Sequence, residues 1–263
     1  MIRAAAMALA MAIALPAAAQ DAAPLASERP KPRPEPGPDV EAPRQASPEE
    51  AADNGTGTAD PPTEAREAGR RDVLRLDDAS QASCLAALRD LGVVFQEVAA
   101  VVPDDDADCG ILQPVKVSDI APGITLIPEA VVRCPTAQAM AAWVQDFVLP
   151  AAARLADRGA LVAIETGTGY DCRRRNDQAD GDLSEHAFGN AFDVMGFRFE
   201  QGPPLRIEPR AAQGDMAEAF QAAVRASACL DFATVLGPGS NAFHDDHLHL
   251  DILVRTNGFR LCE

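Results

Sequence analysis

Apolar side chains recur at helical spacing in two stretches of the C-terminal half of the chain. The first starts at Pro135, a residue suited to the first turn of a helix. Pro150 lacks the N–H of the helical hydrogen bond, so we expect it to kink or end this helix before residues 151–157 resume it. A second helix is expected over residues 215–229. The apolar faces are Met140, Trp143, Val144, Phe147 and Val148 in the first helix, and Met216, Phe220, Ala223 and Val224 in the second.

Shorter runs with β-branched or alternating apolar residues have the pattern of strands. These runs are LGVVFQEV, PVKVSDI, GITLIP, ALVAIET, NAFDVMGFRF, LRIEP and HLHLDILV. Strands and helices do not alternate strictly along the chain. The pattern therefore favours an α+β domain with an antiparallel or mixed sheet and flanking helices over a doubly wound sheet.

The N-terminal residues read as a targeting segment. Arg3 precedes a short apolar run, and small residues follow up to Ala19, as in a secretory signal peptide cleaved after Ala19. The run is short for a membrane span, and an N-terminal anchor is the alternative reading. We therefore expect residues 1–19 to be a signal peptide. The mature protein is expected to be periplasmic or secreted, without a transmembrane helix.

Residues 20–72 have the composition of a disordered linker. They contain ten of the 21 prolines and no aromatic residue or cysteine, so they offer little apolar surface to bury. Proline occupies every second position from Pro30 to Pro38, which favours an extended polyproline conformation. This stretch is either a tether to a membrane or wall polymer or a low-complexity tail. Residues 73–263 have the length of one folded domain.

Charge and cysteine content narrow the partners and the compartment. The formal net charge of −17 would repel phosphate backbones, so we expect no nucleic-acid partner. The cysteines are even in number and form no C-x-x-C pair, which favours three disulfides in an oxidising compartment over a zinc ribbon. Six cysteines allow 15 pairings, and spacing does not choose among them. They are Cys84, Cys109, Cys134, Cys172, Cys229 and Cys262.

Three of the four histidines fall in FHDDHLHLD, near the C-terminus. If HLHLDILV is a strand, His247, His249 and Asp251 share one face, while the intervening leucines face the core. Neighbouring imidazoles on that face would then lie about 7 Å apart. This spacing suits one metal ligand and one catalytic or orienting group.

The remaining histidine lies in LSEHAFGNAFD. Gly189 and Asn190 favour a turn that returns His186 to the side of Asp193. Two histidines and one aspartate with an open fourth position form the ligand set of a catalytic zinc site. The alternative is a set of surface residues that solvate loops. Clustered ionisable groups in two short motifs favour the metal site.

The two motifs match a known group of proteins. SEHAFGNAFD fits S-x-H-x-x-G-x-A-x-D, and DHLH fits D-x-x-H combined with H-x-H. Together they resemble the zinc D-alanyl-D-alanine carboxypeptidases and murein endopeptidases, which share a metal core with the hedgehog signalling domain. With Y-x-C-R upstream and LGPGSNAFHDDHLHLD at the end, the chain looks more narrowly like the bacterial extensin-like C-terminal domain family.

The resemblance implies a hedgehog or D-Ala-D-Ala-carboxypeptidase-like core that binds Zn²⁺ through His186, Asp193 and His249. Asp246 falls where these peptidases keep their general base, and His247 where a side chain can stabilise an oxyanion or protonate a leaving amine. On an ideal strand Asp246 would face away from His249, so this role requires an irregular chain before Leu248.

Three further roles stay open. The peptidases carry a substrate-polarising arginine after a tyrosine, but here two residues separate Tyr170 from Arg173, the candidate for this role. Ser184 is expected to hold its loop through its hydroxyl. His244 and Asp251 either orient the ligands or are polar neighbours.

The expected function is that of an exported zinc metallopeptidase acting on amide bonds of peptidoglycan or a related cell-wall peptide. The alternative is a zinc-containing module on the same core that binds the wall without cleaving it. A two-metal phosphoesterase would need more ligands than these motifs supply. The sequence leaves the oligomeric state open.

Overall fold

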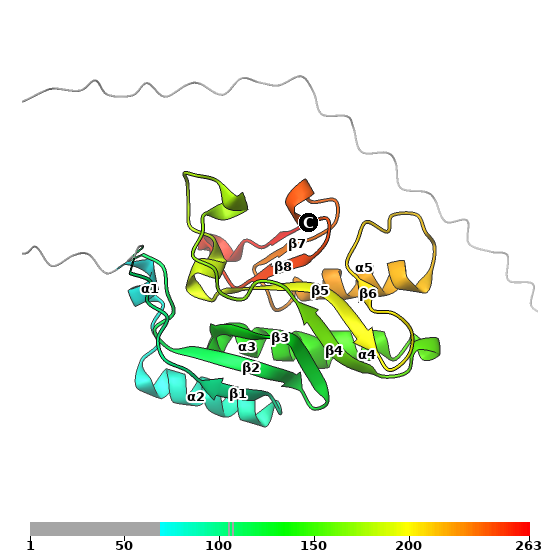
Figure 1. Ribbon diagram of the computed structural model, residues 1–263, viewed down its shortest axis with the longest axis horizontal. Helices are drawn as coiled ribbons and strands as arrows, with labels where there is room; N and C mark the ends of the chain where they lie inside the picture. Colours follow the sequence, from blue (N-terminus) through cyan, green and yellow to red (C-terminus); the bar gives the residue numbers. More distant parts are fainter. Residues whose placement is uncertain (1–68, 105, 107) are drawn as a thin grey trace, which may run out of the picture. The chain divides into compact units, whose positions relative to one another are not determined.

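The computed structural model describes residues 69–263 except residues 105 and 107. The expected signal peptide and nearly all of the expected linker lie outside these residues. The described chain forms an α+β fold with one mixed sheet, as its pattern predicts (Figure 1). The predicted boundary between linker and domain falls inside helix α1, Arg70–Val73.

The sheet has nine strands in the order β1-β2-β3-β4-β5-β8-β7-β9, with β6 paired to β5. Pairs β3–β4 and β7–β9 are parallel, and the other pairs are antiparallel. The strand bounds are Val94–Glu97 (β1), Pro114–Ala121 (β2), Ile124–Arg133 (β3), Leu161–Thr166 (β4), Ala191–Phe199 (β5), Leu205–Arg206 (β6), Thr234–Leu236 (β7), Leu248–Asp251 (β8) and Leu261–Cys262 (β9).

The strand predictions locate the central strands well and overextend the short ones. LRIEP contributes only β6, and HLHLDILV only β8, so His247 and Ile252–Val254 lie outside the strand. Proline at position 209 and the irregular turn before Leu248 limit these strands, because each removes regular ladder hydrogen bonds.

The helices are α2 Asp78–Asp90, α3 Cys134–Trp143, α4 Leu149–Ala152 and α5 Met216–Ala228. Helices α3 and α4 are joined by a π turn, Val144–Val148. Pro150 therefore does not end the helix, because the wider turn accommodates a residue that cannot donate to a carbonyl four positions earlier. The prediction that helix continues over residues 151–157 is wrong, since α4 ends at Ala152. The second predicted helix is confirmed: Phe220 and Val224 are buried, although Met216 is exposed.

The core lies between the sheet and helices α3 and α5. Trp143 is fully buried, and its Nε1 donates to the carbonyl of Val224 at 3.0 Å. Phe197 and Phe232 meet its ring at centroid distances of 6.5 Å and 6.3 Å. These tilted and edge-on aromatic contacts pack the C-terminal part of β5 against the core.

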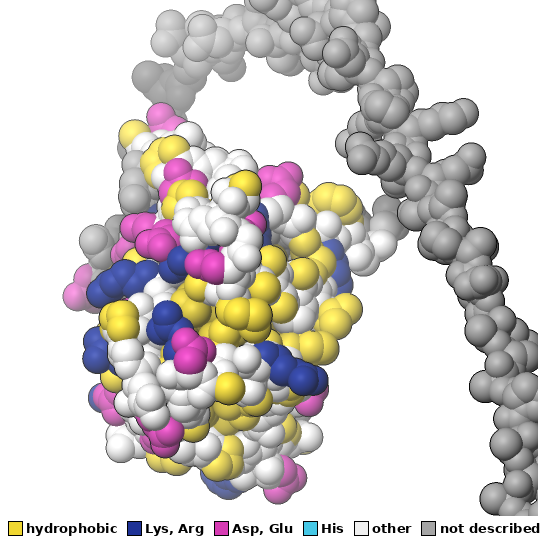
Figure 2. All heavy atoms as spheres, turned by 90° about the vertical axis from the view of Figure 1, so that its right-hand side faces the viewer, with side chains coloured by type: hydrophobic (Ala, Val, Ile, Leu, Met, Phe, Trp, Pro, Cys, Tyr) yellow, Lys and Arg dark blue, Asp and Glu magenta, His cyan; other side chains and the backbone are white. Residues whose placement is uncertain are grey.

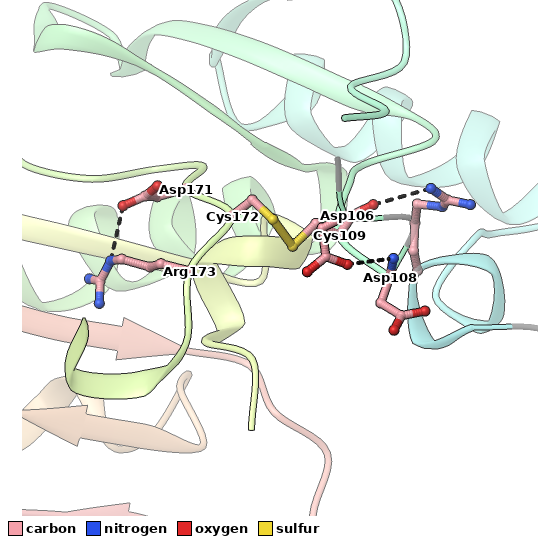
Figure 3. Close-up of a disulfide and its surroundings, with 7 residues drawn as sticks. Asp106, Asp108, Cys109, Asp171, Cys172 and Arg173 are labelled. Carbon is pink, nitrogen blue, oxygen red and sulfur yellow. Dashed lines mark hydrogen bonds and ion pairs between the residues drawn. A yellow bond between two sulfur atoms is a disulfide. The ribbon is translucent and has the colours of Figure 1, made fainter. Parts of the chain in front are cut away.

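Three disulfides are present, as the cysteine count predicts. Cys84–Cys134 joins α2 to the start of α3, and Cys229–Cys262 joins the end of α5 to β9. Cys109–Cys172 links the loop before β2 to the loop after β4 (Figure 3). Among the residues that the structure describes, no helix is both long enough and apolar enough to cross a bilayer.

Candidate metal centre

Strands β5 and β8 bring two of the predicted ligands together. They pair antiparallel with Asp193 directly opposite His249, so both side chains leave the same face of the sheet. Asp193 Oδ1 lies 3.2 Å from His249 Nδ1. Leu248 and Leu250 point to the other face and are fully buried, as the alternation predicts.

A tight turn before β5 brings His186 to the same point. Ser184 caps a 3-10 turn, Glu185–Phe188, by accepting a hydrogen bond from the His186 N–H. Gly189 then adopts a left-handed conformation, with φ of 64°. A Cβ at Gly189 would also lie 2.3 Å from the Ile111 side chain, so only glycine fits here.

The three predicted ligands form a compact triangle of donor atoms. His186 Nε2 lies 3.0 Å from His249 Nδ1 and 3.2 Å from Asp193 Oδ1, which closes the triangle with the 3.2 Å contact of the strand pair. Bonds of 2.0–2.1 Å in tetrahedral zinc place neighbouring donors about 3.4 Å apart. The triangle therefore fits three corners of a zinc coordination sphere.

A second group of donors does not fit a metal. Asp106, Cys109 and Cys172 also lie close together, but both sulfurs are used in a disulfide (Figure 3). A disulfide sulfur carries no thiolate to bind zinc. The cluster of His186, Asp193 and His249 is thus the candidate metal centre in the described chain. Its three residues are buried. The face drawn in Figure 2 shows no histidine.

Outer contacts orient both imidazoles. His186 Nδ1 lies 3.2 Å from the carbonyl of Gly169, and His249 Nε2 lies 3.2 Å from Asp251 Oδ2. Each acceptor keeps a proton on the nitrogen it faces, which leaves the other nitrogen of each ring for a metal. Asp251 thus contacts His249, as an orienting role would require.

The charged groups of the cluster shift the pKa values of one another. Burial alone would raise the pKa of Asp193, but the facing imidazoles of His186 and His249 outweigh it and hold that pKa far below its ordinary value. Burial would lower the pKa of His249, but the hydrogen bonds that its ring donates to the carboxylates of Asp193 and Asp251 raise that pKa to about 9. Without a metal, a proton on His249 therefore offsets the buried carboxylates.

Zinc affinity is expected to rise with pH. His249 is protonated below a pKa of about 9, so a metal must displace that proton in neutral solution. The apparent affinity should increase roughly tenfold per pH unit up to that value and then level off. Calorimetric titration in buffers of different ionisation enthalpy would count the released proton. An affinity independent of pH from 6 to 8 would contradict a ligand role for His249.

The residues before β8 place His247 near the triangle and Asp246 next to His247. Because β8 begins at Leu248, residues 245–247 are irregular, as a role for Asp246 requires. His247 Nδ1 lies 2.9 Å from Asp246 Oδ1, and His247 Nε2 lies 3.9 Å from Asp193 Oδ1. His247 thus stands between Asp246 and the triangle. Asp246 itself is 78% exposed.

His244 contacts the rings of both His247 and His249. Its ring lies 5.1 Å from that of His247 and 5.7 Å from that of His249, and its Nδ1 lies 2.7 Å from Asn241 Oδ1. Burial, reinforced by the charges of His249 and His247, lowers the pKa of His244 to about 4. His244 is therefore a neutral polar neighbour of the ligands.

Arg173 lines the same cavity as these histidines. Its Nε donates to Asp171 Oδ2 at 3.0 Å, and the disulfide at Cys172 anchors the loop between them (Figure 3). In Figure 1 this yellow-green loop and the orange turn before β8 rise on the same side of the sheet. Both border a cavity of about 1000 Å³ that contains the donor triangle.

A buried ionic network behind His186 was not predicted. Glu185 is almost fully buried, and Arg70 from α1 approaches it at 2.8 Å. Asn190 Nδ2 donates to Glu185 at 3.0 Å, and Arg133 donates to both Asn190 and the carbonyl of Leu74. The network joins α1, the start of α3 and the 3-10 turn Glu185–Phe188, here called the ligand turn because it carries His186. Arg70 is 115 residues from Glu185, so no local pattern points to this pair.

Loss of the Arg70 charge is expected to weaken metal binding. Arg70→Met keeps an aliphatic stem over the ring of Phe188 but leaves Glu185 without its nearest cation. The turn that carries His186 should loosen, and zinc affinity should fall by up to roughly 10-fold, the lower limit for losing a group that contacts a metal ligand directly. Competition with a chelating dye measures this, and Arg70→Lys should restore most of it. Arg75→Met is the control, since Arg75 is exposed and 4.0 Å from exposed Asp78. Equal losses in both variants would contradict the role of Arg70.

The fold and the donor triangle define a mixed α+β domain with a buried His₂Asp candidate metal centre. Residues 82–263 match the family described as "Extensin-like protein C-terminus", and the chain belongs to this extensin-like family. The family description names no reaction. Comparisons with curated proteins and with solved structures gave no significant match.

Proposed function

We propose that this domain is an exported zinc metallopeptidase that hydrolyses amide bonds of peptidoglycan or a related cell-wall peptide. The observation that carries the proposal is the donor triangle of His186, Asp193 and His249, which opens into a cavity large enough for a peptide. The hedgehog-type or carboxypeptidase-like core and the periplasmic or secreted location are parts of the same proposal.

The residues around the triangle have the functional groups that amide hydrolysis needs. Zinc, when bound, would supply a Lewis acid that polarises a carbonyl and acidifies water. Asp246 accepts the proton that the attacking water loses, since it lies in the irregular turn at the cavity. His247 faces the triangle through Nε2 and stabilises the oxyanion or delivers that proton to the leaving amine. The products are one carboxylate and one amine.

Arg173 takes the role of a substrate-polarising cation in this proposal. The Cys109–Cys172 disulfide and the hydrogen bond from the Ser184 N–H to the Arg173 carbonyl hold its backbone beside the ligand turn. The side chain lines the cavity and is close enough to the histidine cluster to help lower the pKa of His244. A fixed cation there can stabilise developing negative charge on a carbonyl.

Digestion of purified peptidoglycan by the zinc-loaded protein tests the proposal. We expect soluble fragments whose masses show the addition of water across an amide bond, and no such fragments after zinc is removed by a chelator. The masses identify which bond is cut. Muropeptide binding without any product, with zinc bound, would contradict the hydrolase and favour a non-catalytic wall-binding module.

A further inference from the structure

The cavity beside the donor triangle is lined by three arginines, and two of them have structural hydrogen bonds. Arg255 donates to the carbonyl of Ala233 at 2.8 Å and to Thr234 Oγ1 at 2.7 Å. Arg173 donates to Asp171 at 3.0 Å. Both guanidinium groups are thus engaged with the walls of the cavity.

Arg175 differs from the other two. Its closest partners are Asp182 at 3.6 Å and Glu185 at 3.8 Å, both beyond hydrogen-bond distance. Within the part of the chain that the structure describes, its side chain donates no hydrogen bond. Glu185 already has Arg70 at 2.8 Å, and Asp182 is 82% exposed, so neither contact uses the donors of Arg175.

The backbone around Arg175 is fixed relative to the metal ligands. The Arg175 N–H donates to the carbonyl of Asp182 at 3.1 Å, and Arg174 and Leu183 form an antiparallel bridge. Ser184 continues this pairing and caps the turn that carries His186. The backbone that carries the Arg175 side chain is therefore held beside the cavity that this side chain lines.

A guanidinium with unused donors is suited to one kind of ligand. Its planar fork binds a carboxylate through two parallel hydrogen bonds, which a neutral amide cannot match. The chain carries a net charge of −17, so most of its surface would repel an anionic ligand. A cation at the mouth of the cavity gives such a ligand a favourable place to bind.

Apolar side chains also line the cavity. Phe243 is 59% exposed at its edge, and Leu253 and Leu261 also line it. An aromatic or aliphatic surface of this kind packs against methyl and methylene groups. The apolar residues and Arg175 together suit a peptide that has both small apolar groups and a negative charge.

We propose that the cavity selects an acidic peptide and that Arg175 recognises a free carboxylate on it. This inference rests on the proposed function only in that the cavity receives the substrate. The carboxylate is either the C-terminal carboxylate of the peptide or that of a glutamyl residue. Arg175 is a specificity residue, separate from the proton-transferring groups.

Binding of a synthetic peptidoglycan stem tetrapeptide tests the proposal. It is used in four forms, with its glutamyl and C-terminal carboxylates each either free or amidated, on the full zinc-loaded chain. Amidation of the recognised carboxylate should weaken binding roughly 10- to 100-fold, the range of hydrogen bonds to charged groups. Arg175→Gln should bind all four forms equally, and the form that weakens wild-type binding identifies the source of the carboxylate.

Arg174→Gln is the matched control. Arg174 neighbours Arg175, but its side chain donates to the carbonyl of Gly181 and does not line the cavity. This variant should discriminate as the wild type does. Wild-type binding that is equal for all four forms, or absent for all, would overturn the proposal, as would discrimination that persists in Arg175→Gln. Discrimination without hydrolysis would refute the peptidase and leave this inference standing, whereas hydrolysis without discrimination would do the reverse.

Discussion

Replacing Asp246 with asparagine is expected to lower amide hydrolysis by a factor of about 10² to 10⁴ while one zinc stays bound. The amide keeps the size of the side chain and can still contact His247 Nδ1, which lies 2.9 Å from Asp246 Oδ1. It cannot accept a proton from water at neutral pH. Asp246 is no part of the donor triangle, so the metal site should be unchanged. The measurement pairs kcat on a muropeptide with zinc content.

Asp245→Asn is the control for this prediction. Asp245 lies in the same turn, but its carboxylate accepts a hydrogen bond from the Gly239 N–H and does not line the cavity. Its replacement should leave kcat within about twofold, as for most surface changes. Full activity of Asp246→Asn would remove the proposed base. A parallel loss in both variants would indicate a disturbed turn.

Replacing Asp193 with asparagine is expected to reduce zinc affinity by more than about 100-fold, beyond the usual effect of altering an outer contact. Asp193 is the only anionic member of the triangle, and it lies 3.2 Å from the donor nitrogen of each histidine. A neutral amide is a poorer ligand for zinc and also loses the attraction to the metal charge. Competition with a chelating dye at fixed pH measures the change.

His247→Gln separates ligands from neighbours in the same assay. His247 Nε2 approaches Asp193 at 3.9 Å but lies outside the triangle. Zinc affinity should therefore change much less than in Asp193→Asn. If both variants retain wild-type affinity, the metal does not bind at this triangle. If His247→Gln loses zinc as completely as Asp193→Asn, His247 is itself a ligand.

Much of the candidate site could be predicted because each part depends on local chemistry. Alternation along β8 places His249 on one face of the strand and the buried leucines on the other. Gly189 allows the turn that returns His186 toward Asp193. Strand geometry also predicts that a role for Asp246 needs an irregular chain before Leu248, and residues 245–247 are irregular.

Other parts depend on contacts between distant segments, which local pattern does not encode. Six cysteines allow 15 pairings, and the pairing depends on which segments the fold brings together. The Arg70–Glu185 pair has no sequence signal beyond the position of Glu185 next to His186. Three successive arginines at 173–175 were visible, but only the fold distinguishes the one that lines the cavity with unused donors.

The most direct test of the account is anomalous X-ray diffraction, at the zinc absorption edge, from crystals of protein purified without chelator. We predict a single peak of near-full occupancy within about 2.0–2.2 Å of His186 Nε2, Asp193 Oδ1 and His249 Nδ1. The same protein should contain one zinc per chain by elemental analysis. A map with no anomalous peak at these three atoms, from metal-replete protein, would contradict the metal centre and the function proposed from it.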